Sequence, residues 1–496
     1  MVFATLTSKV FGMLRDILLA SHYGTTTEAI AYETASRLPI LLFDFVIGGV
    51  VSASFIPIFN EILVKKDKKE ALGFANTYVN LVLAVTAALT LIGVIFSDLF
   101  VGFIAPDIAP EAHELAASLS RIMFPMIIFC GLAFSFVGIL QSLGEFNVPA
   151  IISLVSNGIM VAYFVFLDKY FGVVGLSVAM LVGWAAQAAV QIPSVAKRGY
   201  RYSPTLNFNS PYIKRSLSLA FPILVSTWAQ PALTLIATRF ASSLEDGRAI
   251  IAVGYANRLN LIIVGVFSFV ATNLLFPMIS RAEGSGDTTA AERVTNTSSK
   301  LLLLVIIPIA VGAVILAEPI ISLIFGRGEF GADDVLLTAS ALRFFALGMP
   351  FLAICEVLTK LFFAKQRARV PMTGALCAIA ANLVLTWALY SSLGVAGIAL
   401  SSSFAVAVNM LTNYAFLRRD GGRLFERGGV YDLLGMLVSA AVMGAAVYFV
   451  RALTAHLGDV LSLLVSVAAG VPVYGVMIAL LGFKKYTLVF LKRMKK

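Results

Sequence analysis

The stretch Val148-Pro-Ala-Ile-Ile-Ser-Leu-Val-Ser-Asn-Gly-Ile-Met-Val-Ala-Tyr-Phe-Val-Phe-Leu167 decides the fold, because it runs for about twenty residues without a charged side chain. An α-helix of this length rises about 30 Å, which matches the hydrocarbon core of a bilayer. Similar stretches recur along the 496-residue chain, which is 59% hydrophobic and only 13% charged. Soluble domains carry roughly a quarter charged residues. The sequence therefore predicts an all-α polytopic membrane protein.

Apolar runs between polar breaks predict fourteen transmembrane helices. Their approximate ranges are 3–22, 30–62, 72–104, 115–142, 148–167, 172–195, 213–241, 249–280, 299–323, 335–364, 371–391, 395–417, 431–453 and 459–482. The distribution of Lys and Arg tests this count, since cytoplasmic loops carry the positive excess. With the amino terminus inside, only Lys169, Arg248 and Arg327 of the 37 basic residues fall in outside loops. We therefore predict fourteen helices with both termini in the cytoplasm.

The chain resembles itself at an offset of 222 residues. The matched pairs are Pro149 with Pro371, Gly172 with Gly394, Gly175 with Gly397, and Arg121 with Arg343. Six helices separate equivalent positions, so both halves enter the membrane in the same direction and should be related by a pseudo-two-fold axis along the membrane normal. We predict an N-terminal lobe at 1–205, a C-terminal lobe at 206–428, and two extra helices with a basic tail at 429–496. Two six-helix lobes around a central cleft are typical of transporters.

Charged residues lie inside the first two expected helices, where each charge costs at least about 3 kcal/mol. They are Lys9, Arg15, Asp16, Glu33, Arg37 and Asp44, and Glu28 lies two residues before the second helix. Lys9 and Asp16 share one helix face, and Glu33, Arg37 and Asp44 share another. Two interpretations remain open: the stripes line a water-filled cavity, or they form structural ion pairs, above all Glu33 with Arg37 at i,i+4.

Arg258 is a further charge deep in an expected helix. It is the repeat counterpart of Arg37, and its own helix places no acidic residue beside it. An arginine in a cleft without an acidic neighbour indicates an anionic ligand, because its planar fork of donors suits phosphate and carboxylate.

The sequence predicts no catalytic centre, no metal site and no cofactor. The three histidines, at 22, 113 and 456, are far apart, and no metal-ligand spacing or Ser–His pairing is visible. An enzyme acting on polyprenyl phosphates would need carboxylates or histidines grouped near the headgroup plane, and no expected inside loop groups them. Despite a net charge of +10, no segment is long and polar enough to form a nucleic-acid-binding domain. We expect a transporter and not an enzyme, with no nucleic acid as partner.

Five short motifs follow one another along the chain. They are Ser8-Lys9-Val-Phe-Gly12-Met-Leu-Arg15-Asp16, Phe55-Ile-Pro57 with Glu61, Arg121-Ile-Met-Phe-Pro125, Ala256-Asn-Arg258-Leu259, and Phe325-Gly-Arg-Gly-Glu-Phe330 with Asp333. This ordered set resembles the MurJ (MviN) lipid II flippases of bacteria, within the superfamily of multidrug and oligosaccharidyl-lipid exporters. The likeness covers essentially the whole chain.

The resemblance implies a flippase that moves lipid-linked peptidoglycan precursor from the inner to the outer leaflet of the bacterial cytoplasmic membrane by alternating access. It implies a central cationic cavity that binds the diphosphate and sugar headgroup. The positions carried over are Lys9, Arg15, Arg258 and Glu28, where Lys9 replaces the family's usual Arg and Glu28 its usual Asp. Asp16, next to Arg15 in the opening motif, is a further candidate for substrate binding. The family usually has an Arg pair near Asp44, where this chain inverts the charge. Arg37, seven residues earlier on the same face, is expected to supply the positive charge instead.

The resemblance also implies that the two extra helices form a groove for the polyprenyl tail. The alternative functions are export of another polyprenyl-linked oligosaccharide and multidrug export within the same superfamily. Drug exporters of this superfamily generally have twelve helices, which argues against the second alternative. We expect a monomer whose partners are a lipid-linked anionic glycan and membrane lipid.

Overall fold

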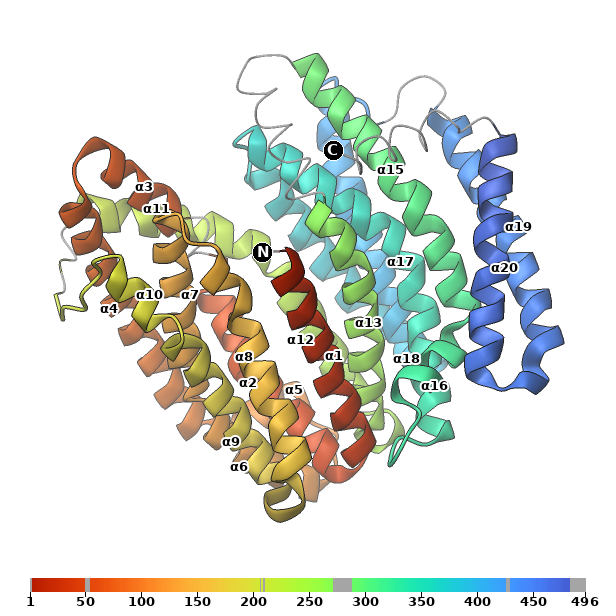
Figure 1. Cartoon of the computed structure of the whole chain (residues 1–496), viewed down its shortest axis with the longest axis horizontal. Coiled ribbons are helices and arrows are strands. Elements are labelled where there is room, and N and C mark those ends of the chain that lie inside the picture. The colour runs from red at the N-terminus through yellow and green to blue at the C-terminus, as the bar shows by residue number, and fades with distance from the viewer. Residues whose placement is uncertain are drawn as a thin grey trace. The chain divides into compact units, whose positions relative to one another are not determined.

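The computed structural model describes residues 2–49, 54–205, 207, 210–270, 288–424 and 429–481. In these ranges the chain forms helices joined by turns and loops, and no described residue lies in a strand (Figure 1). Among the described residues, eight helices are long and apolar enough to cross a membrane, or nine if one bent helix pair counts as a single span. The prediction of an all-α membrane protein is therefore confirmed, while the count of fourteen spans stays a prediction.

The first of two compact units comprises Met1–Ile251 and Gly328–Phe330. Its helices are α1 (Val2–Tyr23), α2 (Thr27–Val46), α3 (Ile56–Lys65), α4 (Lys68–Ile95), α5 (Ser97–Ile104), α6 (Pro110–Met123), α7 (Met126–Ser142), α8 (Asn147–Phe166), α9 (Asp168–Ala189), α10 (Ile192–Lys197), α11 (Pro211–Thr227) and α12 (Ala229–Ala241). Helices α11 and α12, which the lobe prediction places after residue 205, thus pack within the first unit.

The second unit comprises Ala252–Arg327 and Gly331–Lys496. Its helices are most of α13 (Arg248–Val270), α15 (Thr288–Ile315), α16 (Ala317–Phe325), α17 (Ala332–Ala364), α18 (Arg369–Arg419), α19 (Gly429–Thr454) and α20 (Asp459–Leu480). Helices α19 and α20, the two extra helices of the sequence prediction, lie side by side (Figure 1).

Local chemistry explains where several helices begin. Thr26 precedes α2 and its Oγ1 accepts a hydrogen bond from the backbone N–H of Ala29 at 3.5 Å. Asp67 precedes α4 and accepts from the backbone N–H of Glu70 at 2.7 Å. Such caps satisfy backbone donors that have no partner inside the helix. Helices α3, α6 and α11 begin at a proline in the first turn, where the missing N–H costs nothing.

Breaks in the helices recur at corresponding places of the two sequence halves. Helix α4 gives way to α5 at Phe96, with φ −102° and ψ 22°, and α15 gives way to α16 at Leu316, with φ −99° and ψ 16°. The two breaks are 220 positions apart.

Helix α18 has 51 residues, about 75 Å at 1.5 Å per residue, which is far longer than a bilayer. Its backbone leaves the helical conformation at Gly394, between the predicted spans 371–391 and 395–417.

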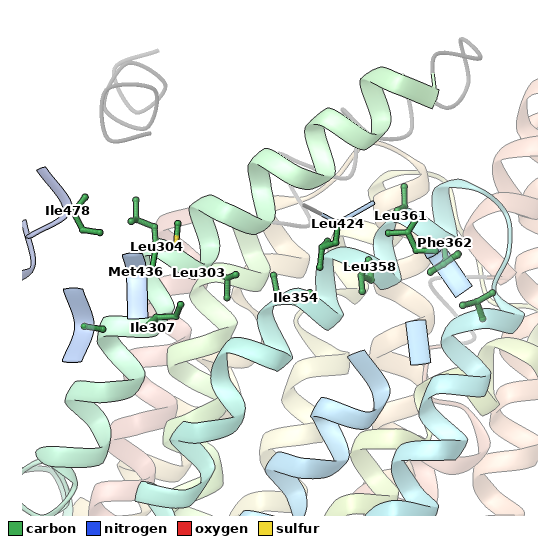
Figure 2. Packing of buried hydrophobic residues seen from close by; sticks show 13 residues of the cluster. Leu303, Leu304, Ile307, Ile354, Leu358, Leu361, Phe362, Leu424, Met436 and Ile478 are labelled. Atoms are coloured by element: carbon green, nitrogen blue, oxygen red, sulfur yellow. The ribbon is translucent and has the colours of Figure 1, made fainter. Parts of the chain in front are cut away.

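The core of the second unit contains an apolar cluster that joins the extra helices to the rest of the unit. Figure 2 shows Leu303, Leu304 and Ile307 of α15 together with Met436 of α19 and Ile478 of α20. The same cluster includes residues of α17 and α18. Helix α19 packs against α15, and α20 packs against α19 and α16, and this arrangement positions the groove described below.

Candidate functional site

Arg15 on α1 lies at the centre of a polar network inside the first unit. Its Nε and Nη2 donate to Asp16 Oδ1 at 3.1 and 2.8 Å, and its Nη1 donates to Asn157 Oδ1 of α8 at 3.1 Å. The Asp16 side chain is only 8% exposed, while that of Arg15 is 31% exposed. The network thus fixes the guanidinium and leaves part of it accessible to a ligand.

Arg37 on α2 joins three segments of the first unit. Its Nη1 donates to Thr238 Oγ1 of α12 at 2.6 Å, and its Nη2 donates to the backbone carbonyl of Ile250 at 3.1 Å and to Glu33 Oε2 at 3.4 Å. Both charged side chains are largely buried, with 12% of Arg37 and 2% of Glu33 exposed. The predicted i,i+4 ion pair is therefore present, and the arginine also ties α2 to α12 and to the beginning of α13.

Lys9 and Glu28 lie apart from these two networks. Lys9 is half-buried on α1, and Glu28 is exposed in the first turn of α2. Within the described part of the chain, neither residue forms an ion pair. Of the six candidate residues, the structure therefore brings Arg15 and Asp16 together and places Arg37 in a separate network.

Arg258 is on α13 in the second unit and rests on an aromatic platform. Its guanidinium carbon lies 5.5 Å from the ring centre of Tyr255, one helical turn earlier. The Tyr255 ring is buried and stacks on Phe325, with 4.6 Å between ring centres and an interplanar angle of 12°. A cation over an aromatic face is stabilised by about 0.5–2 kcal/mol. The platform therefore limits the orientations that Arg258 can adopt.

An apolar groove lies between α15, α19 and α20. Its cavity volume is about 580 Å³. Its lining is Leu301, Leu304, Val305, Pro308, Ile309, Gly312, Leu316, Met443, Val447, Val467, Gly470, Val471, Tyr474, Gly475, Ile478 and Ala479. The hydroxyl group of Tyr474 already has a hydrogen-bond partner, because it donates to the backbone carbonyl of Leu304 at 2.7 Å. The groove therefore suits a hydrocarbon chain.

Ion pairs fasten α19 near both of its ends. Lys300 Nζ of α15 lies 2.7 Å from Asp432 Oδ2 near the beginning of α19, and the lysine is buried. Arg451 near the other end donates to the carbonyl of Ile315 at 2.8 Å and to Glu318 Oε2 at 3.1 Å. Sequence reasoning did not identify Asp432 or Glu318 as partners, since neither lies near its cation in the chain.

Charged and hydrogen-bonded side chains inside a bundle of membrane-length helices, together with an apolar groove, define a multi-pass α-helical membrane protein with transporter architecture. The model of the family described as "Lipid II flippase MurJ" matches residues 19–469. The chain belongs to this family.

Curated relatives agree with this membership. A probable lipid II flippase MurJ from Rhizobium tropici is 29% identical over 455 residues, which cover 90% of this chain and 85% of that protein. Its counterpart from Bdellovibrio bacteriovorus is 30% identical over 426 residues, which cover 84% and 81%.

The fold is also similar to solved transporter structures. A lipid II flippase MurJ in an inward closed conformation matches with a TM-score of 0.81 at 22% identity, over 100% of this chain and 99% of that one. An inward-facing multidrug resistance MATE family transporter matches with a TM-score of 0.70 at 15% identity, over 83% and 94%. The drug transporter thus leaves more of this chain unmatched than the flippase does.

Proposed function

We propose that this protein is a flippase that moves lipid II from the inner to the outer leaflet of the bacterial cytoplasmic membrane by alternating access. In this proposal it is a transporter and not an enzyme, and it acts as a monomer with both termini in the cytoplasm. Its substrate is an anionic lipid-linked glycan, and membrane lipid surrounds it. The two lobes of the sequence repeat are related by a pseudo-two-fold axis along the membrane normal, and they rock against each other so that the cleft opens to either side.

The observation that carries this proposal is the apolar groove of about 580 Å³ between α15, α19 and α20. A carrier of small drugs has no need for an apolar groove on two helices added to a twelve-helix repeat. A carrier of a polyprenyl-linked headgroup must hold a long hydrocarbon tail while the headgroup crosses. The groove therefore favours a lipid-linked substrate over multidrug export.

The charged residues are assigned roles according to their contacts. We infer that Arg15, which Asp16 holds in place, and Arg258, which rests on Tyr255, each contact a phosphate group of the substrate, since arginine presents a planar fork of donors. Lys9 adds a mobile positive charge, and Glu28 contacts the sugar part of the headgroup. Arg37 acts mainly by fixing α2 against α12, because its donors are engaged there.

Transport is tested with the full-length chain reconstituted into vesicles that carry labelled lipid II in the inner leaflet only. We expect the protein to make the label accessible from outside, and the Arg15→Ala variant to lose most of this activity while remaining in the membrane. Rescue of bacteria depleted of their own lipid II flippase is the matching test in cells. Transport of drug substrates without transport of lipid II would overturn the proposal in favour of the alternative.

A further inference from the structure

A second cavity lies inside the first unit, between α2 and the helices α11 and α12. Its volume is about 340 Å³. Its polar lining residues are Arg37, Asp44, Thr227, Gln230 and Thr234, and the remainder of the lining is apolar. It therefore combines an apolar wall with several oxygen-bearing side chains.

The hydroxyl groups of this lining are arranged as hydrogen-bond acceptors. Thr227 Oγ1 donates its proton to the carbonyl of Leu224 at 2.9 Å, and Thr234 Oγ1 donates to the carbonyl of Gln230 at 3.0 Å. Each hydroxyl has one proton, so an occupant of the cavity meets oxygen lone pairs. The amide oxygen of Gln230 and the carboxylate of Asp44 add further acceptors.

The charges in the lining are compensated unequally. The positive charge of Arg37 faces Glu33, and its donors serve Thr238 and the Ile250 carbonyl. The half-buried Asp44 forms no hydrogen bond or ion pair with any residue in the described ranges. A partly buried carboxylate without a cation partner is costly, so the cavity favours a positively charged occupant.

We propose that this cavity binds an ammonium group of the substrate headgroup, with Asp44 as its counter-ion. An ammonium group has three donors, which fit the Asp44 carboxylate and the oxygens of Thr227 and Thr234. The volume is that of about ten water molecules at roughly 30 Å³ each, which is far more than a bare metal ion fills. The inference rests on the proposed function, because it assigns the amine-bearing part of the headgroup to this cavity.

The test compares two preparations of the lipid-linked precursor, one with its free amine and one with the amine acetylated. Binding to the full-length protein in lipid nanodiscs is measured for the wild type, Asp44→Asn and Asp107→Asn. The wild type should bind the free-amine form roughly tenfold more tightly, as expected for a charged hydrogen bond. Asp44→Asn should bind both forms equally, and Asp107→Asn, which removes an exposed carboxylate elsewhere, should keep the preference.

Each outcome has a defined meaning. If the wild type binds both forms equally well, the inference is wrong and the proposed function stands, whereas failure to bind either form contradicts the proposed function itself. If affinity depends on added sodium ions and not on the amine, and Asp44→Asn removes that dependence, an inorganic cation occupies the cavity and the inference is overturned. If Asp44→Asn does not fold, Thr234→Val, which removes one acceptor and keeps the shape, should reduce the preference severalfold. An unchanged preference in that variant would also contradict the inference.

Discussion

Gly172 and Gly394, which are 222 positions apart, adopt the same unusual backbone conformation. Gly172 has φ 53° and ψ −149°, and Gly394 has φ 58° and ψ −136°. This region of backbone space is essentially restricted to glycine. A Cβ atom at either position would meet no other atom within 4 Å. The backbone conformation alone therefore requires glycine at these two positions of the predicted repeat.

We predict that Gly172→Ala and Gly394→Ala each lower the free energy of unfolding by about 1–3 kcal/mol, the cost of a side chain in this conformation. Thermal unfolding of the purified protein measures the effect. Gly158→Ala is the matched control, because Gly158 also has open space around it but lies within α8. This control should be neutral or stabilising. Equal effects of all three substitutions would show that the conformation imposes no strain.

The pair Glu33 and Arg37 should behave as a buried ion pair. We expect Arg37→Met to destabilise the protein by about 3–5 kcal/mol, because it leaves the Glu33 carboxylate buried without its cation. The double variant with Glu33→Gln should recover a large part of this loss. The exposed i,i+4 pair Glu61 and Lys65 is the control, and Lys65→Met should cost at most about 1 kcal/mol. Similar losses for Arg37→Met and Lys65→Met would contradict the assignment.

Arg258 should contribute directly to headgroup binding. We expect Arg258→Ala to weaken binding of a soluble headgroup analogue by about ten- to a hundredfold, the effect of losing a charge-assisted hydrogen bond. Arg258→Lys should keep part of the affinity, because the positive charge remains. Calorimetry on purified, monodisperse protein provides the measurement. Unchanged affinity in the alanine variant would show that Arg258 has a structural role only.

Filling the groove should impair the transport of long-tailed substrates. Gly312 and Gly475 line the groove, and a Cβ atom at either would meet no atom within 4 Å. Gly312→Leu and Gly475→Leu should therefore fold normally and slow the transport of substrates with long polyprenyl tails more than those with short tails. Gly158→Leu, outside the groove, should slow neither. If Gly312→Leu and Gly475→Leu transported substrates with long and short tails equally well, the groove would have no role in transport.

The orientation of the chain is tested by cysteine labelling in intact cells. Cysteines that replace Ser243 and Asp459 should react with an impermeant thiol reagent, while those that replace Lys68 and Arg423 should not. All four positions are exposed, so burial does not limit the reaction. The native Cys377 is exposed and should first be replaced by alanine. Labelling at Lys68 from outside would reverse the predicted topology.

Hydropathy predicted the fold class because an uncharged apolar stretch as long as 148–167 is compatible with few structures other than a transmembrane helix. It could not settle the number of spans, because several expected spans are interrupted. The expected span 30–62 contains α2 and α3, and residues 50–53 between them lie outside the described residues. The expected span 213–241 is divided between α11 and α12 next to Trp228. Charged residues such as Arg15 and Arg37 also lower the mean hydropathy of the helices that contain them. The folded protein accommodates these charges because they have hydrogen-bond partners on neighbouring helices.

The candidate site was predictable only where partners are close in sequence. Glu33 and Arg37, at i,i+4, form the predicted pair. By contrast, Asn157 lies 142 positions from Arg15, and Thr238 lies 201 positions from Arg37. A lone asparagine in an apolar stretch indicates a buried partner, but the identity of that partner depends on helix packing. Distant pairs of this kind are visible only in the folded chain.

The uniformly apolar lining of the groove has a thermodynamic consequence. Lipid tails are as apolar as leucine side chains, so a hydrocarbon chain that leaves the bilayer for this groove gains little hydrophobic free energy. Affinity must then come almost entirely from the headgroup, while the groove determines where the tail lies. Because α19 is fastened at both ends to α15 and α16, the groove and α15 move together. A tail guided in this way can be released into either leaflet without a large energetic barrier of its own.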